Sequence, residues 1–506
     1  MRYRSTRDIE AKEYVTAAEA IKRGLAPDGG LYLPEGTPAL SSSDIEKLCG
    51  LSYSERAAYI LSLFLDDYDK DGLKADCDAA YGEEKFPSDP SCAALGGSVS
   101  GAAPVVDIGG GLYSLELWHG PTCAFKDMAL QIMPRLLVRA LRMTGEEKLA
   151  HILVATSGDT GKAALEGYRD VEGVKMTVFY PNDGVSKMQQ RQMTTQEGNN
   201  VYVCAVEGNF DDAQTGVKKI FSDKALAEKA LENGFFFSSA NSINWGRLVP
   251  QVVYYVSAYC DLVSAGKIKL GDSVNVCVPT GNFGNIFAAY IAREMGLPVS
   301  HFICASNANN VLTDFINTGV YDRTREFYKT MSPSMDILIS SNLERLLCRI
   351  GGEAMTKDLM TALNTEGKYT APADVMEKIR ALFSGYCMNE EETASALRRT
   401  FEERGYLADP HTTVGLGCAE KYRAETGDET PIILASTASP YKFSADVCRS
   451  LGMTVADEND IEGILNALSA ATKTEIPAPL ARTLTLPVRF TEVVDPAKMA
   501  EIPFRG

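Results

Sequence analysis

The feature that most constrains the fold is an alternation of strand-length apolar runs with longer amphipathic runs, which begins near residue 148. Apolar runs occupy residues 149–156, 174–181 and 200–208, and the same rhythm resumes at 273–281, 299–307 and 429–437. Such alternation is typical of βαβ units, in which helices join parallel strands. We therefore predict an α/β protein with two lobes, each a mostly parallel sheet flanked by helices.

The length of 506 residues suggests about three folding units at roughly 150 residues each. We predict an N-terminal domain at 1–103, which ends in a Gly/Ser/Ala-rich stretch at 93–101. The first α/β lobe is then expected at 104–240 and the second at 241–506. Residues from about 340 to 405 are polar and helix-like, and we expect them to form a helical insertion without strands.

Charge and composition exclude several classes of function. Lys and Arg total 50 against 67 Asp and Glu, and a net charge of −17 argues against nucleic-acid or anionic-membrane partners. No apolar run reaches the roughly 20 residues of a membrane span, and the N-terminus lacks the apolar core of a signal peptide. We expect a cytoplasmic protein that acts on a small molecule. The sequence does not decide between a monomer and a dimer.

Metal chemistry is not expected. The 12 cysteines are scattered without C-x-x-C spacing, which is typical of reduced core residues. The 4 histidines lie far apart in the sequence, which disfavours an assembled metal site.

The loop at 279–285 follows a predicted strand and opens a predicted helix. Glycines there let consecutive backbone N–H groups turn toward one point, and a helix N-terminus adds further donors, so the loop suits a phosphate. It matches neither nucleotide-binding glycine signature, which disfavours a triphosphate or dinucleotide. A turn that needs glycine for backbone reasons explains the pattern equally well. The candidate ligands are Gly281, Asn282, Phe283, Gly284 and Asn285.

A second loop, at 155–161, has the same position between strand and helix. Ser157, Asp159 and Thr160 bring hydroxyl and carboxylate groups to a predicted helix N-terminus, a suitable seat for a carboxylate or phosphate. Simple helix capping by Asp159 or Thr160 explains the same residues. Both loops follow strands, and a parallel sheet binds ligands at the carboxyl ends of its strands.

Lys126 lies at the start of a predicted helix, where the positive end of the helix dipole disfavours a cation. Together with apolar Phe125, this position favours the free amine that Schiff-base chemistry requires. The alternative is a solvated lysine paired with Asp127.

A reactive lysine together with a phosphate loop, without metal ligands or a dinucleotide signature, points to pyridoxal phosphate. The hydroxyl-rich turn at 436–439 could then supply a neutral partner for the ring nitrogen. Asn241, Ser242 and Arg247 precede another predicted helix, and Arg247 could bind a carboxylate or phosphate. Lys187 is a weaker candidate for an anion site. A surface arginine and a helix cap explain the 241–247 segment as well.

These motifs resemble the threonine synthase family, in its longer, pyridoxal-phosphate-dependent type. The resemblance runs from about residue 3 to about residue 445 and implies the tryptophan synthase β-like fold of type II enzymes. Two motifs are particular to this family rather than to the wider fold: NSINWGR at 241–247 and SPSMDILISSNLER at 332–345. Other motifs that carry the resemblance are LAPDGGLYLPEG, HGPTCAFKD, TSGDTG, QRQMTT, GNFDDAQ, PTGNFGN and DPHTTVG.

The resemblance implies a role for each candidate. Lys126 would bind the cofactor as a Schiff base and move protons at the substrate's Cα and Cβ. Residues 281–285 would hold the cofactor phosphate, and Thr437 its ring nitrogen. Ser157, Asp159 and Thr160 match the loop that meets the substrate carboxylate and the cofactor's 3′-hydroxyl; Asn241, Ser242 and Arg247 match positions that grip the substrate phosphate.

The implied reaction converts O-phospho-L-homoserine and water to L-threonine and phosphate, by a carbon–oxygen lyase acting on a phosphate ester. An elimination-only lyase that acts on phosphohomoserine, serine or threonine is the nearest alternative, and a non-catalytic anion-binding module is another. Two residues depart from expectation. Ser439 stands where the family usually has histidine, and an ionised Asp159 would repel the 3′-oxygen, so it either shares a proton or points elsewhere.

Overall fold

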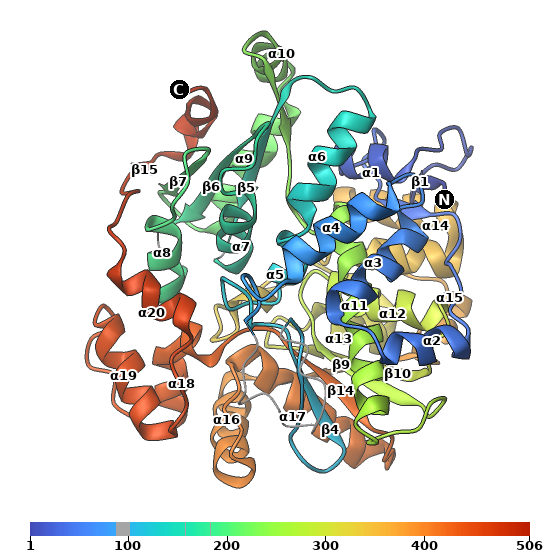
Figure 1. The fold of residues 1–506 in the computed structure, drawn as a ribbon, viewed down its shortest axis with the longest axis vertical. Helices are drawn as coiled ribbons and strands as arrows, with labels where there is room; N and C mark the ends of the chain where they lie inside the picture. The colour runs from blue at the N-terminus through green and yellow to red at the C-terminus, as the bar shows by residue number, and fades with distance from the viewer. Residues whose placement is uncertain (88–101, 157, 183, 506) are drawn as a thin grey trace.

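Two sheets of parallel strands dominate the computed structural model, which describes residues 1–87, 102–156, 158–182 and 184–505 (Figure 1). The Gly/Ser-rich stretch expected at 93–101, and Ser157, lie outside the described residues. The predicted class, an α/β protein with two mostly parallel sheets flanked by helices, is confirmed.

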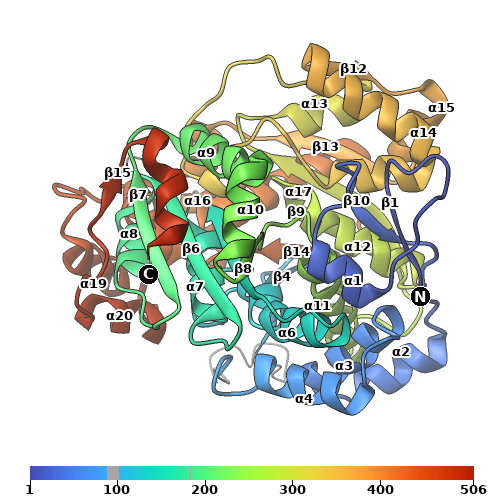
Figure 2. The ribbon, with the colours of Figure 1, turned by 90° about the horizontal axis from the view of Figure 1, so that it is seen from above.

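The first sheet has five strands in the order β15-β7-β6-β5-β8, and every pair is parallel. Helices cover both of its faces: Figure 2 shows α7 on one side and α9 with α10 on the other. Along β5, Ile152 and Val154 belong to the core on the α7 side, whereas Leu153 packs with α9. Its strands are β5 (Leu149–Ala155), β6 (Val174–Pro181), β7 (Val201–Val206), β8 (Phe235–Ser238) and β15 (Val493–Val494), with helices α7 (Asp159–Tyr168), α8 (Lys187–Thr194), α9 (Phe210–Ser222) and α10 (Lys224–Glu232).

The second sheet has six strands in the order β13-β10-β9-β14-β4-β3, and all neighbours are parallel except β3 and β4. Helix α17, buried from Pro410 to Ala419, packs on β9 and β10. The elements are β3 (Val105–Asp107), β4 (Leu112–Glu116), β9 (Val274–Pro279), β10 (Val299–Ser306), β13 (Phe383–Cys387) and β14 (Ile432–Ser436), with α12 (Gly284–Glu294), α13 (Val311–Thr318), α16 (Glu390–Arg404) and α17 (Pro410–Thr426).

The sheets do not follow the predicted boundary at residue 240. Strands β3 and β4 precede it but belong to the six-stranded sheet, and β15 follows it but pairs with β7 of the five-stranded sheet. Strand pairing joins segments that are distant in sequence, and position along the chain does not reveal it.

The expectation of a strand-free insertion at 340–405 was wrong. This region holds α14 (Leu343–Glu366), β12 (Lys368–Thr370), α15 (Ala373–Arg380) and β13. Strand β12 pairs with β11 (Val320–Asp322), and β13 is an edge strand of the six-stranded sheet. Ser384 and Gly385 interrupt the apolar run of β13, so the sequence did not indicate a strand there. Parallel pairing with β10 holds this segment in the strand conformation.

The N-terminal segment packs on α11 (Trp245–Ser264), whose residues from Trp245 to Leu262 are all buried. Helices α2 and α3 contact it directly. A buried ion pair reinforces this contact: Arg56 Nη1 lies 2.6 Å from Asp261 Oδ1. The N-terminal elements are β1 (Tyr3–Ser5), α1 (Ala17–Arg23), β2 (Tyr32–Pro34), α2 (Ser42–Cys49), α3 (Tyr53–Phe64) and α4 (Lys70–Tyr81).

The helix predicted after Lys126 is divided in two, α5 (Asp127–Leu130) and α6 (Met133–Met143). Pro134 lies in the first turn of α6, where its missing N–H is tolerated, whereas one continuous helix would place it in the interior. Residue 126 therefore precedes a helix of only 4 residues.

The C-terminal region forms a helical group and then returns to the five-stranded sheet (Figure 1). Its elements are the 3₁₀ helix η3 (Pro440–Phe443), α18 (Ser444–Ser450), α19 (Ile461–Thr472), α20 (Ala478–Thr485), β15 and the 3₁₀ helix η4 (Pro496–Phe504). A further 3₁₀ helix, η2, spans Pro333–Met335. Among the described residues, none of the helices has the length and apolarity that a membrane crossing requires.

Candidate active site

Loops that follow β4, β5, β9 and β14 meet at the carboxyl ends of the parallel strands. The segment with Lys126 lies against the turn with Thr437: the Phe125 N–H donates to the Thr437 carbonyl at 2.8 Å, and the Ser439 N–H donates to the Cys123 carbonyl at 3.1 Å. Ala124 and Ala438 form an antiparallel bridge between the two segments. The structure therefore brings two of the predicted residues, Lys126 and Thr437, side by side.

Lys126 has the chemical character that a Schiff-base lysine needs. Burial, the main cause, together with the nearby positive charges of Arg247 and Lys442, lowers its pKa to about 7, although Asp159 acts in the opposite direction. Its Nζ lies 4.1 Å from the centre of the Phe125 ring. Because α5 is so short, burial and charge explain the free amine better than the helix dipole that the sequence suggested.

Asp127 does not neutralise Lys126 at the surface, as the alternative interpretation assumed. It is fully buried, and its carboxylate accepts hydrogen bonds from the Thr122 N–H and hydroxyl, both at 2.8 Å. Burial raises the pKa of Asp127 to about 6, against the effect of these hydrogen bonds. Asp127 therefore fixes the loop that presents Lys126.

The 281–285 loop has a geometry that fits a phosphate. Phe283 adopts a left-handed conformation with φ of 62°, and within the described chain no side chain caps the first turn of α12, so its N–H groups stay available. The Asn285 Oδ1 accepts from the Tyr254 hydroxyl at 2.8 Å and from Tyr255, which turns the amide nitrogen away. Among the described residues, this buried Nδ2 has no partner. An orphaned donor beside free helix amides suits the phosphate of pyridoxal phosphate.

The 281–285 loop is held in place by residues for which the sequence had suggested no individual role. Asn342 donates to the Asn282 carbonyl through both its N–H and its side-chain amide, each at 3.0 Å. The same side chain reaches the Ser242 hydroxyl at 3.4 Å, so Asn342 joins the cofactor loop to the candidate substrate loop. Arg345 in turn binds Asn342 and, at 2.6 Å, the Ile243 carbonyl. Both belong to the family motif at 332–345, which was the available signal.

Gly281 cannot be replaced without cost. A Cβ atom there would lie 2.7 Å from the Ser334 carbonyl oxygen, on the segment that covers the loop. Ser334 also donates its N–H to His411 Nε2 at 3.0 Å and faces Asp159 with its hydroxyl. The 332–341 segment therefore packs over the site rather than away from it.

Asp159 is buried at the start of α7 and forms an ion pair with Lys442, whose Nζ lies 2.7 Å from Oδ1. Gln189 donates to the same oxygen at 2.8 Å. Burial raises the pKa of Asp159, but the charge of Lys442 and these hydrogen bonds outweigh it and hold the pKa below its usual value. Asp159 is therefore ionised, and its ion-pair partner is a lysine that the sequence reasoning left out. Thr160 occupies the same first turn.

Arg247 is an arginine without a carboxylate partner within the described part of the chain. It is 2% exposed, donates to the Ala240 carbonyl, and leaves a buried Nε unpaired among the described residues. Burial lowers its pKa to about 10. A buried, incompletely paired cation next to Lys126 suits an anionic ligand. Asn241 and Ser242, half-buried, precede it in the same loop.

Lys187 is exposed at the first position of α8, and its positive charge faces Asp457. Its role as an anion ligand stays a prediction, as do the roles of Thr160, Asn241 and Ser242. Among the described residues, no group of three or more His, Cys, Asp or Glu side chains could hold a metal ion.

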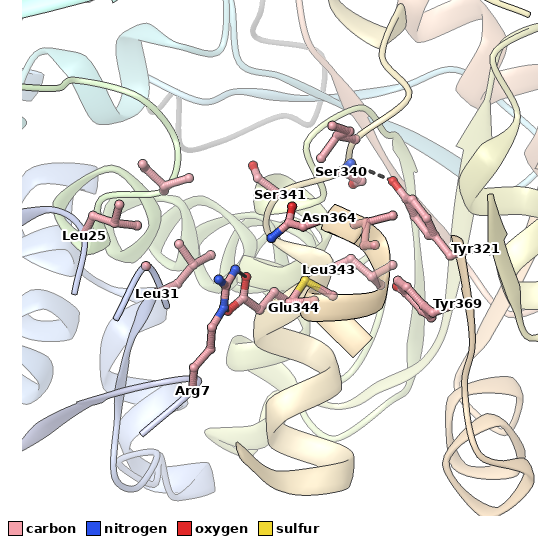
Figure 3. A pocket seen from close by; sticks show the side chains of 15 residues that line it. Arg7, Leu25, Leu31, Tyr321, Ser340, Ser341, Leu343, Glu344, Asn364 and Tyr369 are labelled. Carbon is pink, nitrogen blue, oxygen red and sulfur yellow. Dashed lines mark hydrogen bonds and ion pairs between the residues drawn. The ribbon is translucent and has the colours of Figure 1, made fainter. Parts of the chain in front are cut away.

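A separate pocket lies behind this cluster, between the N-terminal segment and the start of α14 (Figure 3). Several of its polar groups pair with one another: Arg7 donates to Glu344 in two hydrogen bonds of 2.8 and 2.7 Å, and the Ser340 N–H donates to the Tyr321 hydroxyl at 2.7 Å. The Ser340 hydroxyl donates to the Gly281 carbonyl at 2.7 Å. One wall of the pocket thus supports the phosphate loop.

The depressed pKa of Lys126 predicts how the cofactor-free protein takes up pyridoxal phosphate. Because the free amine is the nucleophile, the rate of Schiff-base formation should rise about fivefold between pH 6 and pH 7 and level off above about pH 8. Stopped-flow absorbance between pH 6 and pH 9 checks this. A rate that keeps rising steeply through pH 9 would indicate an ordinary lysine and contradict the assignment.

The fold and the site define a pyridoxal-phosphate-dependent enzyme of fold type II, and the family description "Pyridoxal-phosphate dependent enzyme" matches residues 104–437. Two further descriptions narrow the class: "Threonine synthase N terminus" matches residues 2–81, and "Threonine synthase, C-terminal" matches residues 412–502. The chain belongs to the threonine synthase family. The cofactor of this family is pyridoxal phosphate.

Individual relatives support this placement. Threonine synthase of Pseudomonas aeruginosa is 38% identical over 446 residues, which is 88% of this chain and 89% of that protein. Human threonine synthase-like 1 is 40% identical over 454 residues, 87% of this chain but 58% of that protein, so the chain spans less than two thirds of such relatives. The crystal structure of PLP-bound threonine synthase from Brucella melitensis has a TM-score of 0.85 and 35% identity, covering 99% of this chain and 98% of that one.

Proposed function

We propose that this protein is a threonine synthase, which converts O-phospho-L-homoserine and water to L-threonine and inorganic phosphate. The observation that carries the proposal is the buried, incompletely paired Arg247 beside the low-pKa Lys126. Arg247 would bind the phosphate leaving group, and Lys126 would act as a base next to it. Family membership and the named threonine synthases among its relatives support it.

Lys126, the 281–285 loop and Thr437 would hold pyridoxal phosphate at its carbonyl carbon, its phosphate and its ring nitrogen. When bound, this cofactor withdraws electrons from the substrate and acidifies its Cα–H. The free helix amides and the orphaned Asn285 Nδ2 can bind phosphate oxygens without a formal positive charge. Arg247 is therefore available to bind a second anion.

In this scheme the protein's own residues do three things. Arg247, with Asn241 and Ser242, holds the substrate phosphate until the Cγ–O bond breaks. Lys126 accepts and returns protons at Cα and Cβ, for which a pKa near 7 is well matched to neutral pH. The N-terminal turn of α7, with Thr160, binds the substrate carboxylate, and a water then adds at Cβ.

The decisive experiment supplies the holoenzyme with O-phosphohomoserine in ¹⁸O-labelled water and measures threonine, 2-oxobutyrate and phosphate together. We expect threonine in equal amount to phosphate, with the label in the threonine side-chain hydroxyl and none in the phosphate. A matched reaction with Lys126→Ala should yield neither product.

Two other outcomes would overturn the proposal. Release of 2-oxobutyrate and ammonia in place of threonine would identify an elimination-only lyase. Labelled phosphate with homoserine would reveal simple cleavage of the P–O bond.

A further inference from the structure

Lys442 is a second buried lysine beside Lys126, and the proposed reaction leaves it without a role. It lies in η3, directly after the turn with Thr437, and its side chain is 0% exposed. Its ammonium makes two contacts, to Asp159 Oδ1 at 2.7 Å and to the Thr122 carbonyl at 2.9 Å. Ser439, which replaces the family's usual histidine, accepts from the Tyr441 N–H at 3.3 Å and caps η3.

The two oxygens of Asp159 differ in their surroundings. Oδ1 receives both Lys442 and the Gln189 amide, at 2.7 and 2.8 Å. Oδ2 meets the Ser334 hydroxyl at 3.5 Å, the outer limit for a hydrogen bond. The carboxylate is thus held firmly through Oδ1, whereas Oδ2 remains available to a ligand.

Several charged or titratable groups face this pair. Lys126, before α5, lies near both side chains of the pair, and Arg247, from α11, lies near Lys126. Asp127 and Lys162 also lie near Lys442. His411, from α17, accepts the Ser334 N–H at Nε2, and its Nδ1 lies 2.7 Å from Asp409 Oδ1.

We propose that Lys442 is a positioning residue whose buried ammonium keeps the Asp159 carboxylate ionised and fixed beside Lys126. The two side chains together then place no net charge next to the 3′-oxygen of the cofactor. The family resemblance places that oxygen against Asp159. A lone carboxylate there would repel a phenolate oxygen, whereas a carboxylate neutralised by Lys442 does not. The inference concerns the cofactor and holds whichever substrate the enzyme uses.

The test uses the protein reconstituted with pyridoxal phosphate and measures the pH midpoint of the visible absorbance change that reports protonation at the Lys126 nitrogen. Lys442→Met removes a positive charge and should raise this midpoint by about 1–2 pH units. Asp159→Asn removes a negative charge and should lower it by a similar amount. These sizes follow from unit charges several ångströms apart at an effective dielectric constant of about 20.

The double variant Lys442→Met/Asp159→Asn carries neither charge and should return the midpoint to within about 0.5 pH unit of the wild type. It also keeps the test valid if Lys442→Met alone fails to fold because Asp159 is left buried and unpaired. Lys421→Met, which removes a lysine paired at the surface with Glu392, is the control and should leave the midpoint unchanged.

A purely structural role would lower the thermal stability of the cofactor-free single variants without moving their midpoints in opposite directions. Unchanged midpoints, or shifts of the same sign in both single variants, would overturn the proposal. Because no substrate is present, this outcome is independent of whether threonine is formed.

Discussion

Replacing Lys126 with alanine is expected to abolish covalent attachment of pyridoxal phosphate and to lower turnover by at least about 10³-fold. Borohydride treatment should fix the cofactor onto the wild-type chain at Lys126 and leave the variant unlabelled, which peptide mass spectrometry can measure. The physical reason is that Lys126 supplies both the Schiff-base nitrogen and, with a pKa near 7, the proton acceptor.

Lys148→Ala is the matched control, because Lys148 is an exposed lysine that directly precedes β5. It should be labelled as the wild type is. Cofactor fixed at another lysine of the Lys126→Ala protein would show that the reactive residue has been misassigned.

Replacing Arg247 with leucine is expected to raise the KM for the phosphorylated substrate by about 10–100-fold while the cofactor remains bound. Charge-assisted hydrogen bonds contribute about 1.5–3 kcal/mol, and about 1.4 kcal/mol corresponds to a factor of ten. The cofactor phosphate has its own donors at residues 281–285, so borohydride labelling should be unaffected. Steady-state kinetics and labelling of the same preparation check both statements.

The stability of the cofactor-free Arg247→Leu protein should equal or exceed that of the wild type, because the variant no longer buries an incompletely paired cation. The contrast is Arg56→Leu, which leaves Asp261 buried and unpaired and should lower the free energy of unfolding by about 3–5 kcal/mol. Loss of the cofactor from the Arg247→Leu protein, or an unchanged KM, would contradict its assignment to the substrate phosphate.

The sequence predicted the longer strands that alternate with amphipathic, helix-length runs. Residues 149–156, 174–181 and 299–307 each contain the strand expected there. Strand β13 was not predicted, because its short run contains Ser384 and Gly385. Its stability comes from pairing with β10 rather than from local propensity. Similarly, nothing local indicates that β4 and β14 are neighbours, since that pairing is decided by the packing of the whole sheet.

The candidate site could be predicted where a residue is unusual for its local position, as Lys126 and the 281–285 loop are. Lys442 could not, because a lysine next to tyrosine and phenylalanine resembles an ordinary surface residue whose stem packs on aromatic rings. The role of Lys442 depends on its ion pair with Asp159, which lies far away in the sequence. Asn342 and Arg345 belong to a motif that marked the family, but their contacts with Asn282 and Ile243 appear only in three dimensions.

The order of strands in the two sheets has a consequence for biosynthesis. Strand β4 lies between β3 and β14, so its inner edge has no parallel partner until residues 432–436 have been synthesised. The five-stranded sheet likewise receives its edge strand, β15, only with residues 493 and 494. Neither sheet can be completed while the C-terminal quarter of the chain is still on the ribosome, so the nascent chain must keep β4 and β7 from pairing with other chains during most of translation.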